Sequence, residues 1–146
     1  MRSIIRGVYI ITASSGSTLG GMAASWVSQA SFSPPLFMVS IGPSRHTHKV
    51  ISEGKNFCIN IMPESGIAMA KRFGTTTGSK VDKFSGTPYH KAVTGAPVLD
   101  NAVAYIDCKV VQSIPAGDHT IFVGEVAEAK VTSTEPPAVY RHNDFF

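Results

Sequence analysis

Short runs of β-branched and aromatic residues recur along the whole chain, separated by clusters of glycine, serine and proline. Such runs are typical of β-strands, and the clusters between them are typical of turns. The predicted strands are residues 7–12, 22–29, 36–41, 56–62, 102–114 and 119–132. The last two are joined by Pro115-Ala116-Gly117-Asp118, which predicts a long hairpin. This pattern restricts the chain to a mainly β fold.

Two segments have the composition of short helices. Residues 47–53 are followed by Gly54, a residue type at which helices commonly stop. Residues 65–73 begin with Ser65, a residue type that caps helix starts, and end at Gly74. Six or more strands with one or two short helices predict a small, mainly antiparallel barrel, whose closure removes exposed strand edges.

Three other features refine this prediction. Residues 14–21 are rich in glycine and serine and are expected to form a turn. Asn56 and Asn60 are even-spaced in their predicted strand and indicate a polar face. Residues 75–99 have a loop-like composition, and a loop of this length in a compact domain is usually functional or covers something. The sequence contains no repeat or linker, so residues 1–146 are expected to form one domain.

Composition limits the class of protein. Hydrophobic residues make up 43% of the 146 residues and charged residues 16%, which argues against intrinsic disorder. No apolar run approaches the roughly 20 residues of a membrane span, and the N-terminus has too short an apolar stretch for a signal peptide. A cytoplasmic protein without membrane contact is therefore expected. Cys58 and Cys108 each lie in an apolar run without a CxxC motif, which predicts two buried free thiols.

The net charge of +3 is a mild excess of basic residues, and these residues are scattered. Nucleic-acid binding would need a clustered basic stripe with interleaved aromatic residues, so no nucleic-acid partner is expected. A small anionic ligand, such as a phosphorylated cofactor, fits the charge equally well.

Several familiar functional motifs are incomplete or absent in this sequence. Residues 74–80 resemble a P-loop, but the run is one residue short between its glycines and follows a predicted helix. The glycines before the second predicted strand do not spell GxGxxG, and no βαβ unit surrounds them. His46-Thr47-His48 lacks a nearby carboxylate or cysteine cluster, so no metal site is expected. The sequence has no GxSxG motif to support serine hydrolase chemistry.

Residues 21–36 have an unusual composition for a core strand, with many small residues and serines. Small residues allow a backbone to approach a flat ligand, and serine hydroxyls and backbone N–H groups can hold phosphate or ring oxygens. An ordinary serine-rich edge strand would have the same composition. The residues alone leave both interpretations open.

A series of short motifs then follows in a fixed order along the chain. They are Gly7-Val8-Tyr9-Ile10-Ile11-Thr12, Gly21-Met22-Ala23-Ala24-Ser25, Ser31-Phe32-Ser33-Pro34-Pro35-Leu36, residues 44–51, Phe57-Cys58-Ile59-Asn60-Ile61, Met69-Ala70-Lys71-Arg72-Phe73, Asp82-Lys83-Phe84 and residues 117–124. In this order and spacing they resemble the flavin reductase-like family, the FMN-binding split barrels, and most of all its ferric reductases and flavoredoxins. The resemblance implies an antiparallel, Greek-key-like split β-barrel with a few short helices. It also implies a homodimer with FMN near the subunit interface.

The resemblance further implies which residues bind FMN. They are Ala24, Ser25 and Trp26 along the flavin and its phosphate, Ser31 facing the ring, Ser40, Ile41 and Gly42 offering backbone groups, Thr47 and His48 on the phosphate or ribityl side, and Lys83 and Phe84 in a loop near the cofactor. His119 matches a histidine close to the nicotinamide side, where a catalytic role is expected. The chain departs from the family at Ala23, where many relatives have threonine, and at Trp26, where a small polar residue is usual.

For function, the resemblance implies an oxidoreductase that takes hydride from NADH or NADPH and passes electrons to a flavin or ferric acceptor. The flavin carries this chemistry, and the hydride step needs no protein acid or base. A second interpretation is an electron carrier that uses FMN to pass electrons between redox protein partners without a nicotinamide. A third is a binding module without redox function. The sequence does not separate the first two.

Overall fold

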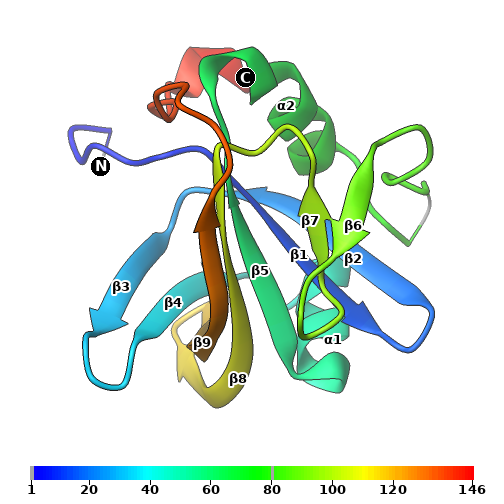
Figure 1. The fold of residues 1–146 in the computed structure, drawn as a ribbon, viewed down its shortest axis with the longest axis vertical. Coiled ribbons are helices and arrows are strands. Elements are labelled where there is room, and N and C mark those ends of the chain that lie inside the picture. The colour runs from blue at the N-terminus through cyan, green and yellow to red at the C-terminus, as the bar shows by residue number, and fades with distance from the viewer. Residues whose placement is uncertain (1, 80) are drawn as a thin grey trace.

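The computed structural model describes residues 2–79 and 81–146 of the chain (Figure 1). Seven strands form one antiparallel sheet in the spatial order β2-β1-β5-β8-β9-β4-β3. They are β1 (Tyr9–Ser15), β2 (Thr18–Ala24), β3 (Val27–Ser31), β4 (Leu36–Ile41), β5 (Asn56–Ile61), β8 (Ala104–Ala116) and β9 (His119–Val131). The predicted mainly β, antiparallel architecture and the long β8–β9 hairpin are confirmed.

The two edge strands of this sheet, β2 and β3, follow each other in the chain with only Ser25 and Trp26 between them. The backbone N–H of Ser40 in β4 donates to the carbonyl of Trp26 at 3.0 Å. The sheet therefore curls until its edges meet at this corner, as a barrel does. The single strand predicted over residues 22–29 is wrong, because the chain leaves one edge at Ser25 and joins the other at Val27.

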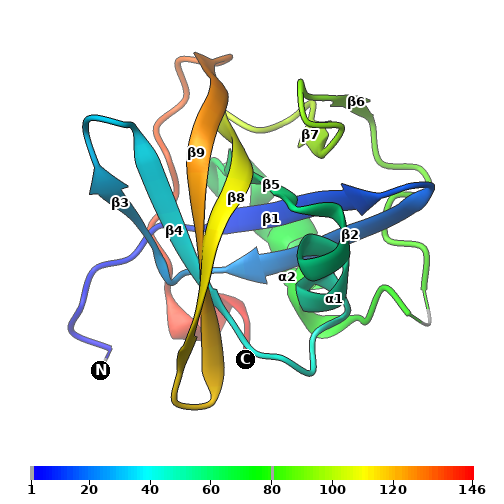
Figure 2. The same ribbon diagram turned by 90° about the horizontal axis from the view of Figure 1, so that it is seen from below.

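The helices lie on the β1–β2 side of the molecule (Figure 2). They are α1 (His46–Gly54) and α2 (Ile67–Thr75), with short 3-10 helices η1 (Glu64–Gly66) and η2 (His142–Asp144). Both predicted helices are confirmed, but their ends differ from the prediction. Lys55, with φ of 58°, takes the left-handed conformation that ends α1, and Gly54 is the last helical residue. Ser65 lies in η1 and caps nothing, because α2 begins after Gly66 without a side-chain cap.

Only part of the turn predicted over residues 14–21 is present, as a tight turn at Gly16, where φ is 59°. Gly20 and Gly21 belong to β2 instead. A Cβ on Gly20 would lie 3.2 Å from the Cα of Thr47, and one on Gly21 would lie 2.7 Å from the Phe73 ring. These glycines therefore allow α1 and α2 to pack directly on β2. The P-loop-like run ends at Lys80, which lies outside the described residues.

Strand β5 is buried on both faces. Its odd positions, including Phe57 and Ile59, enter the main core. The even positions form the predicted polar face, but this face is covered, because the hairpin of β6 (Tyr89–Lys91) and β7 (Pro97–Leu99) packs near it. Asn60 is fully buried, donates to the carbonyl of Ile10 at 3.1 Å and accepts from the N–H of Leu99 at 2.9 Å. Part of the predicted 75–99 loop is thus a cover for β5.

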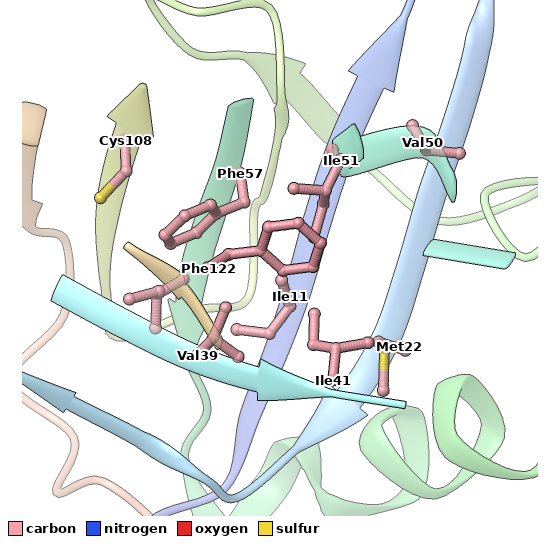
Figure 3. Close-up of a cluster of buried hydrophobic side chains, with 11 residues drawn as sticks. Ile11, Met22, Val39, Ile41, Val50, Ile51, Phe57, Cys108 and Phe122 are labelled. Atoms are coloured by element: carbon pink, nitrogen blue, oxygen red, sulfur yellow. The ribbon is translucent and has the colours of Figure 1, made fainter. Parts of the chain in front are cut away.

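The main core lies inside the curled sheet (Figure 3). Its side chains come from β1, β2, β4, α1, β5, β8 and β9, and the largest fully buried ones include Phe57, Phe122, Ile11, Ile41 and Ile51. Cys58 and Cys108 are buried free thiols, as predicted. Burial raises the pKa of both, that of Cys108 to about 12, so neither is a ready nucleophile at neutral pH.

We predict that Gly54→Ala destabilises the protein by about 1–3 kcal/mol or more, the usual cost of forcing extra atoms into a packed site. A Cβ at this position would lie 1.9 Å from the Ser14 carbonyl oxygen, so α1 must move away from β1. Urea unfolding measures the change. The control is Glu53→Ala on the same helix, which removes an exposed ion pair with Lys49 and should cost less than about 1 kcal/mol. Equal effects of the two variants would contradict the packing argument.

Candidate functional site

A groove of about 460 Å³ opens where β2 and β4 end, at the corner that closes the sheet. Its walls include residues 24–26 from the end of β2, residues 40–42 from the end of β4, and the side chains of Arg6, Arg45 and His119. The corner exists because the chain changes sheet edge between Ala24 and Val27. The ends of two strands thereby meet, and their small residues leave space.

The described side chains that line this groove include positive charges but no aspartate or glutamate. Two arginines, Arg6 and Arg45, face it, together with the hydroxyl-bearing residues Ser25, Ser40 and Ser44. Arg6 donates from Nη1 to the Ser25 hydroxyl oxygen at 3.2 Å. That bond occupies an acceptor position of Ser25 and leaves its O–H free to donate to a ligand.

At one end of the groove the His119 ring lies 4.7 Å from the Trp26 ring, tilted by 46°. The Nδ1 atom of His119 lies 2.8 Å from the carboxylate of Asp118, and this hydrogen bond is the main cause that lowers the Asp118 pKa. His119 thus makes the turn contact that a merely structural histidine would make, and it also lines the groove.

A second hollow of about 250 Å³, here called the phosphate-site hollow, adjoins the groove and shares Arg45, Ser44 and Met22 with it. It is also lined by Thr47, Lys83 and residues 74–78. The start of α1 lies here, with Arg45 at the N-cap position, no side-chain cap and no acidic residue in the first turn. Uncapped N–H groups and the helix dipole favour an anion at such a position.

Lys83 adds a buried charge to this hollow. The side chain is 4% exposed, and Nζ donates to the carbonyls of Gly21 and Phe73, each at 2.7 Å. No carboxylate in the described part of the chain forms an ion pair with it. Burial, and then repulsion by Arg45 and Arg72, lowers the Lys83 pKa to about 8. A buried cation without a counter-ion is costly, and a bound anion would offset that cost.

The loop that carries Lys83 is held in place by Arg72 of α2. Its Nη1 donates to the Lys83 carbonyl at 2.8 Å, and its Nη2 donates to the Thr87 hydroxyl at 2.7 Å. The guanidinium group therefore fixes the backbone at Lys83 and the Thr87 side chain four residues later, while its charge still acts on the ammonium group.

The structure brings together most of the residues expected to bind a cofactor. The groove contains Ala24, Ser25, Trp26, Ser40, Ile41, Gly42 and His119, and the phosphate-site hollow contains Thr47 and Lys83.

Three expected residues line neither hollow. Ser31 lies at the far end of β3, beside the turn to β4. His48 contacts the Thr120 hydroxyl at 2.9 Å and packs edge-on against Phe122, and burial lowers its pKa. Phe84 packs against Phe73 and borders a separate hollow of about 660 Å³.

Sequence reasoning missed Arg6 and Arg45, the two arginines of the groove. Arg45 could have been found, because it lies two residues before the predicted helix 47–53 and so close to its positive end. Arg6 carries no local signal, since it lies before the first strand and reaches the groove only through the curl of the sheet.

Two further findings bear on the class of site. Among the described residues, no three histidine, cysteine, aspartate or glutamate side chains are grouped so that they could hold a metal ion. Within the same residues, no helix is long and apolar enough to cross a membrane.

The family model described as "Flavin reductase like domain" matches residues 1–146, and the chain belongs to this family. The predicted fold class, a split β-barrel with a few short helices, is thereby confirmed. The family consists of flavoprotein oxidoreductases.

Relatives show the same domain in different settings. The chain is 34% identical over 144 residues to a high molecular weight rubredoxin of Moorella thermoacetica, covering 97% of this chain and 63% of that protein. It is 36% identical over 137 residues to diflavin flavoprotein A 1 of Synechocystis sp., covering 93% and 24%. The chain thus spans less than two thirds of the length of either protein.

Among solved structures, the NADH:FAD oxidoreductase SgcE6 of Streptomyces globisporus C-1027 superposes with a TM-score of 0.87 at 28% identity, covering 94% of this chain and 82% of that one. This similarity extends over nearly all of the curled sheet.

We predict that the buried Lys83 makes flavin-free protein more stable as pH rises from about 8 towards 10.5, the ordinary lysine value. In that window the unfolded chain binds more protons than the folded one, so the free energy of unfolding increases with pH. Comparison with Lys83→Met isolates this contribution, because the variant lacks the titrating group. Urea unfolding at about pH 7 and about pH 10 should show the difference between wild type and variant shifting in favour of wild type.

Lys71→Met, which removes an exposed lysine from the same helix as Arg72, is the control. The free energies of unfolding of wild type and Lys83→Met are compared at the two pH values. If their difference is constant with pH, or changes in the opposite direction, Lys83 is not a buried, uncompensated cation.

Proposed function

We propose that this protein is an FMN-dependent NAD(P)H:flavin or ferric reductase. The observation that carries the proposal is the match between the shape and charge of the site and this cofactor. A groove with small and hydroxyl-bearing walls leads into a hollow that holds Arg45, the start of α1 and the uncompensated Lys83. A flat ring joined to a phosphate by a polar chain has the complementary arrangement of parts.

The residues present fit this cofactor. Ala24, Ser25, Ser40 and Gly42 would hold the ring, with Ile41 as an apolar neighbour, and Arg45, Thr47 and Lys83 would hold the phosphate. Bound FMN would supply a ring that accepts hydride from a nicotinamide and returns electrons to an acceptor. Ser31, His48 and Phe84 have no part in this arrangement within one subunit, because they line neither hollow.

The protein's own contribution is positioning and charge. The backbone of residues 40–42 and the Ser25 hydroxyl orient polar edges of a bound ring, and Arg6 and Arg45 stabilise negative charge that develops on it. His119 and Trp26 form one end of the groove, where they limit what can approach the ring. We place His119 beside the nicotinamide, as a residue that shapes its pocket.

Two of the relatives also support an electron carrier as the second candidate. The diflavin flavoprotein and the rubredoxin carry the matching segment as part of a longer chain. In such a setting the domain would exchange electrons with neighbouring redox proteins instead of with a nicotinamide. The name of the solved relative, an NADH:FAD oxidoreductase, favours the reductase.

A single anaerobic experiment separates the two. FMN-loaded protein is mixed with NADH, and separately with NADPH, and the flavin absorbance is followed. Rapid bleaching by either nucleotide supports the reductase. Bleaching that occurs only with a reduced protein donor contradicts it and supports the carrier.

We also propose a homodimer in which residues 1–146 form one domain per subunit. Phe32 is 88% exposed and Val111 is 54% exposed on neighbouring hairpins of the same sheet. Exposed large apolar side chains of this kind are often covered by a partner.

We predict that Arg45→Gln weakens FMN binding by about tenfold or more, since a hydrogen bond to a charged group contributes about 1.5–3 kcal/mol. Titration of flavin-free protein with FMN, followed by quenching of flavin fluorescence, measures the affinity. Lys49→Gln is the matched control, because it removes an exposed charge from the same helix outside both hollows. Equal weakening by the two variants would indicate a general charge effect and would contradict a phosphate contact of Arg45.

We predict that His119→Ala retains FMN but is reduced by nicotinamide about tenfold more slowly, about 1.4 kcal/mol of barrier. Anaerobic stopped-flow absorbance gives the rate, and the ratio of flavin to protein gives the occupancy. His90→Ala is the matched control, because His90 contacts Asp100 as His119 contacts Asp118 but lies outside the groove. Loss of FMN with a normal reduction rate in the remaining holoprotein would contradict the assignment.

A further inference from the structure

A third hollow, here called the Arg6 hollow, adjoins the groove at Trp26. Its volume is about 330 Å³, and it shares Arg6, Ser25, Trp26 and Ser40 with the groove. Its remaining walls are mostly apolar and include the side chains of Ile5, Tyr9, Val27 and Met38. A largely apolar pocket with a few convergent polar groups is the usual form of a small-molecule site, and this volume lies at the low end of the usual range of about 300–1,000 Å³.

Arg6 is the one charged side chain in the described lining of this hollow. No described carboxylate forms an ion pair with it. Its Nη1 donates to Ser25, its guanidinium lies 4.6 Å from the centre of the Tyr140 ring, and its backbone carbonyl accepts from the N–H of Tyr140 at 2.8 Å. These contacts fix the arginine in position and leave its charge without a counter-ion.

One donor of Arg6 is also unsatisfied. Its Nε atom is buried and has no hydrogen-bond partner among the described residues. A buried donor of a charged group without an acceptor is costly, and an anionic oxygen reaching this guanidinium would relieve that cost.

The indole of Trp26 forms the wall between the Arg6 hollow and the groove. It is 51% exposed, although its backbone is fixed by the hydrogen bond from Ser40. An exposed aromatic face held on a fixed backbone is suited to stack against a second planar ring. Trp26 is also the only tryptophan in the chain, so its fluorescence reports on both cavities that it borders.

We propose that the Arg6 hollow is a binding site for a planar aromatic monocarboxylate, with the carboxylate on the Arg6 guanidinium and the ring against Trp26 and the apolar wall. The volume of the Arg6 hollow favours a ligand with one ring. The charge of Arg6 favours an anion, and the exposed indole of Trp26 favours a planar ligand. The site adjoins the proposed flavin groove without overlapping its phosphate end. Because Arg6, Ser25, Trp26 and Ser40 line both cavities, the probe is added to flavin-free protein, where the result does not rest on the proposed function.

The experiment uses flavin-free protein and benzoate as the probe, with calorimetry and Trp26 fluorescence as readouts. Benzamide has the same ring without the charge, and cyclohexanecarboxylate has the charge without the flat ring. We expect benzoate to bind with an affinity about tenfold or more above that of either analogue. Arg6→Gln should lower the benzoate affinity by about tenfold and remove the preference over benzamide.

Two other variants locate the bound probe. Arg141→Gln removes an exposed arginine that pairs with Glu64 next to Tyr140, and it should leave benzoate affinity within about twofold of wild type. Arg45→Gln alters the groove but not the Arg6 hollow, and it should do the same. Circular dichroism of Arg6→Gln checks that the fold persists.

The proposal is wrong if wild type binds benzamide as well as benzoate, or if Arg45→Gln abolishes binding while Arg6→Gln does not. It is also wrong if wild type shows no saturable binding below about 10 mM benzoate. Light scattering of wild type and Ile5→Glu then identifies the reason. A dimer that Ile5→Glu dissociates would show that a second copy of the chain covers the hollow.

Discussion

The corner at Ser25 and Trp26 is the constraint on which the rest of the structure depends. It turns the two edge strands of a seven-stranded sheet into consecutive segments of chain, and the hydrogen bond from Ser40 to the Trp26 carbonyl holds β4 against it. The same corner leaves space beside small residues, so the closure of the sheet and the opening of the groove have one cause. The Arg6 hollow adjoins the groove at the same indole.

The positive charges around this corner lack counter-ions among the described residues, and such an arrangement lowers the stability of the fold without a ligand. Lys83 is buried with two carbonyl acceptors, Arg45 lies at an uncapped helix start, and Arg72 holds the loop that places the lysine. Charge-assisted hydrogen bonds to carbonyls offset part of the cost of burying an ammonium group. They do not replace a counter-ion, and the remaining imbalance favours a ligand that brings negative charge.

The candidate site therefore combines a frame of closely packed strands and helices with positive charges that lack counter-ions in the described part of the chain. Glycines in β2 let both helices pack directly on the sheet, which fixes the start of α1 next to the groove. The side chain of the buried Asn60 links β5 to β1 and β7 through hydrogen bonds with the main-chain groups of Ile10 and Leu99. A frame of this kind would suit the proposed cofactor, which supplies its own chemistry and needs the protein to orient it.

The sequence by itself determined the β architecture, the long hairpin, the two helices and the buried thiols, because each depends on local composition and on alternation along one segment. The small-residue and serine pattern of residues 21–36 left a ligand site and an ordinary edge strand both open, and the resemblance alone named Ser40 and Thr47. In the structure Ala24, Ser25 and Ser40 line the groove, and Thr47 lines the adjoining hollow. The break of one predicted strand at Ser25 and the role of Gly20 and Gly21 in packing depend on contacts between distant segments. Ser31 and His48 were placed at the site by resemblance, and within one subunit they lie elsewhere. Arg6 comes to the groove only because a seven-stranded sheet curls until its edges meet, and no local pattern in a sequence encodes that closure.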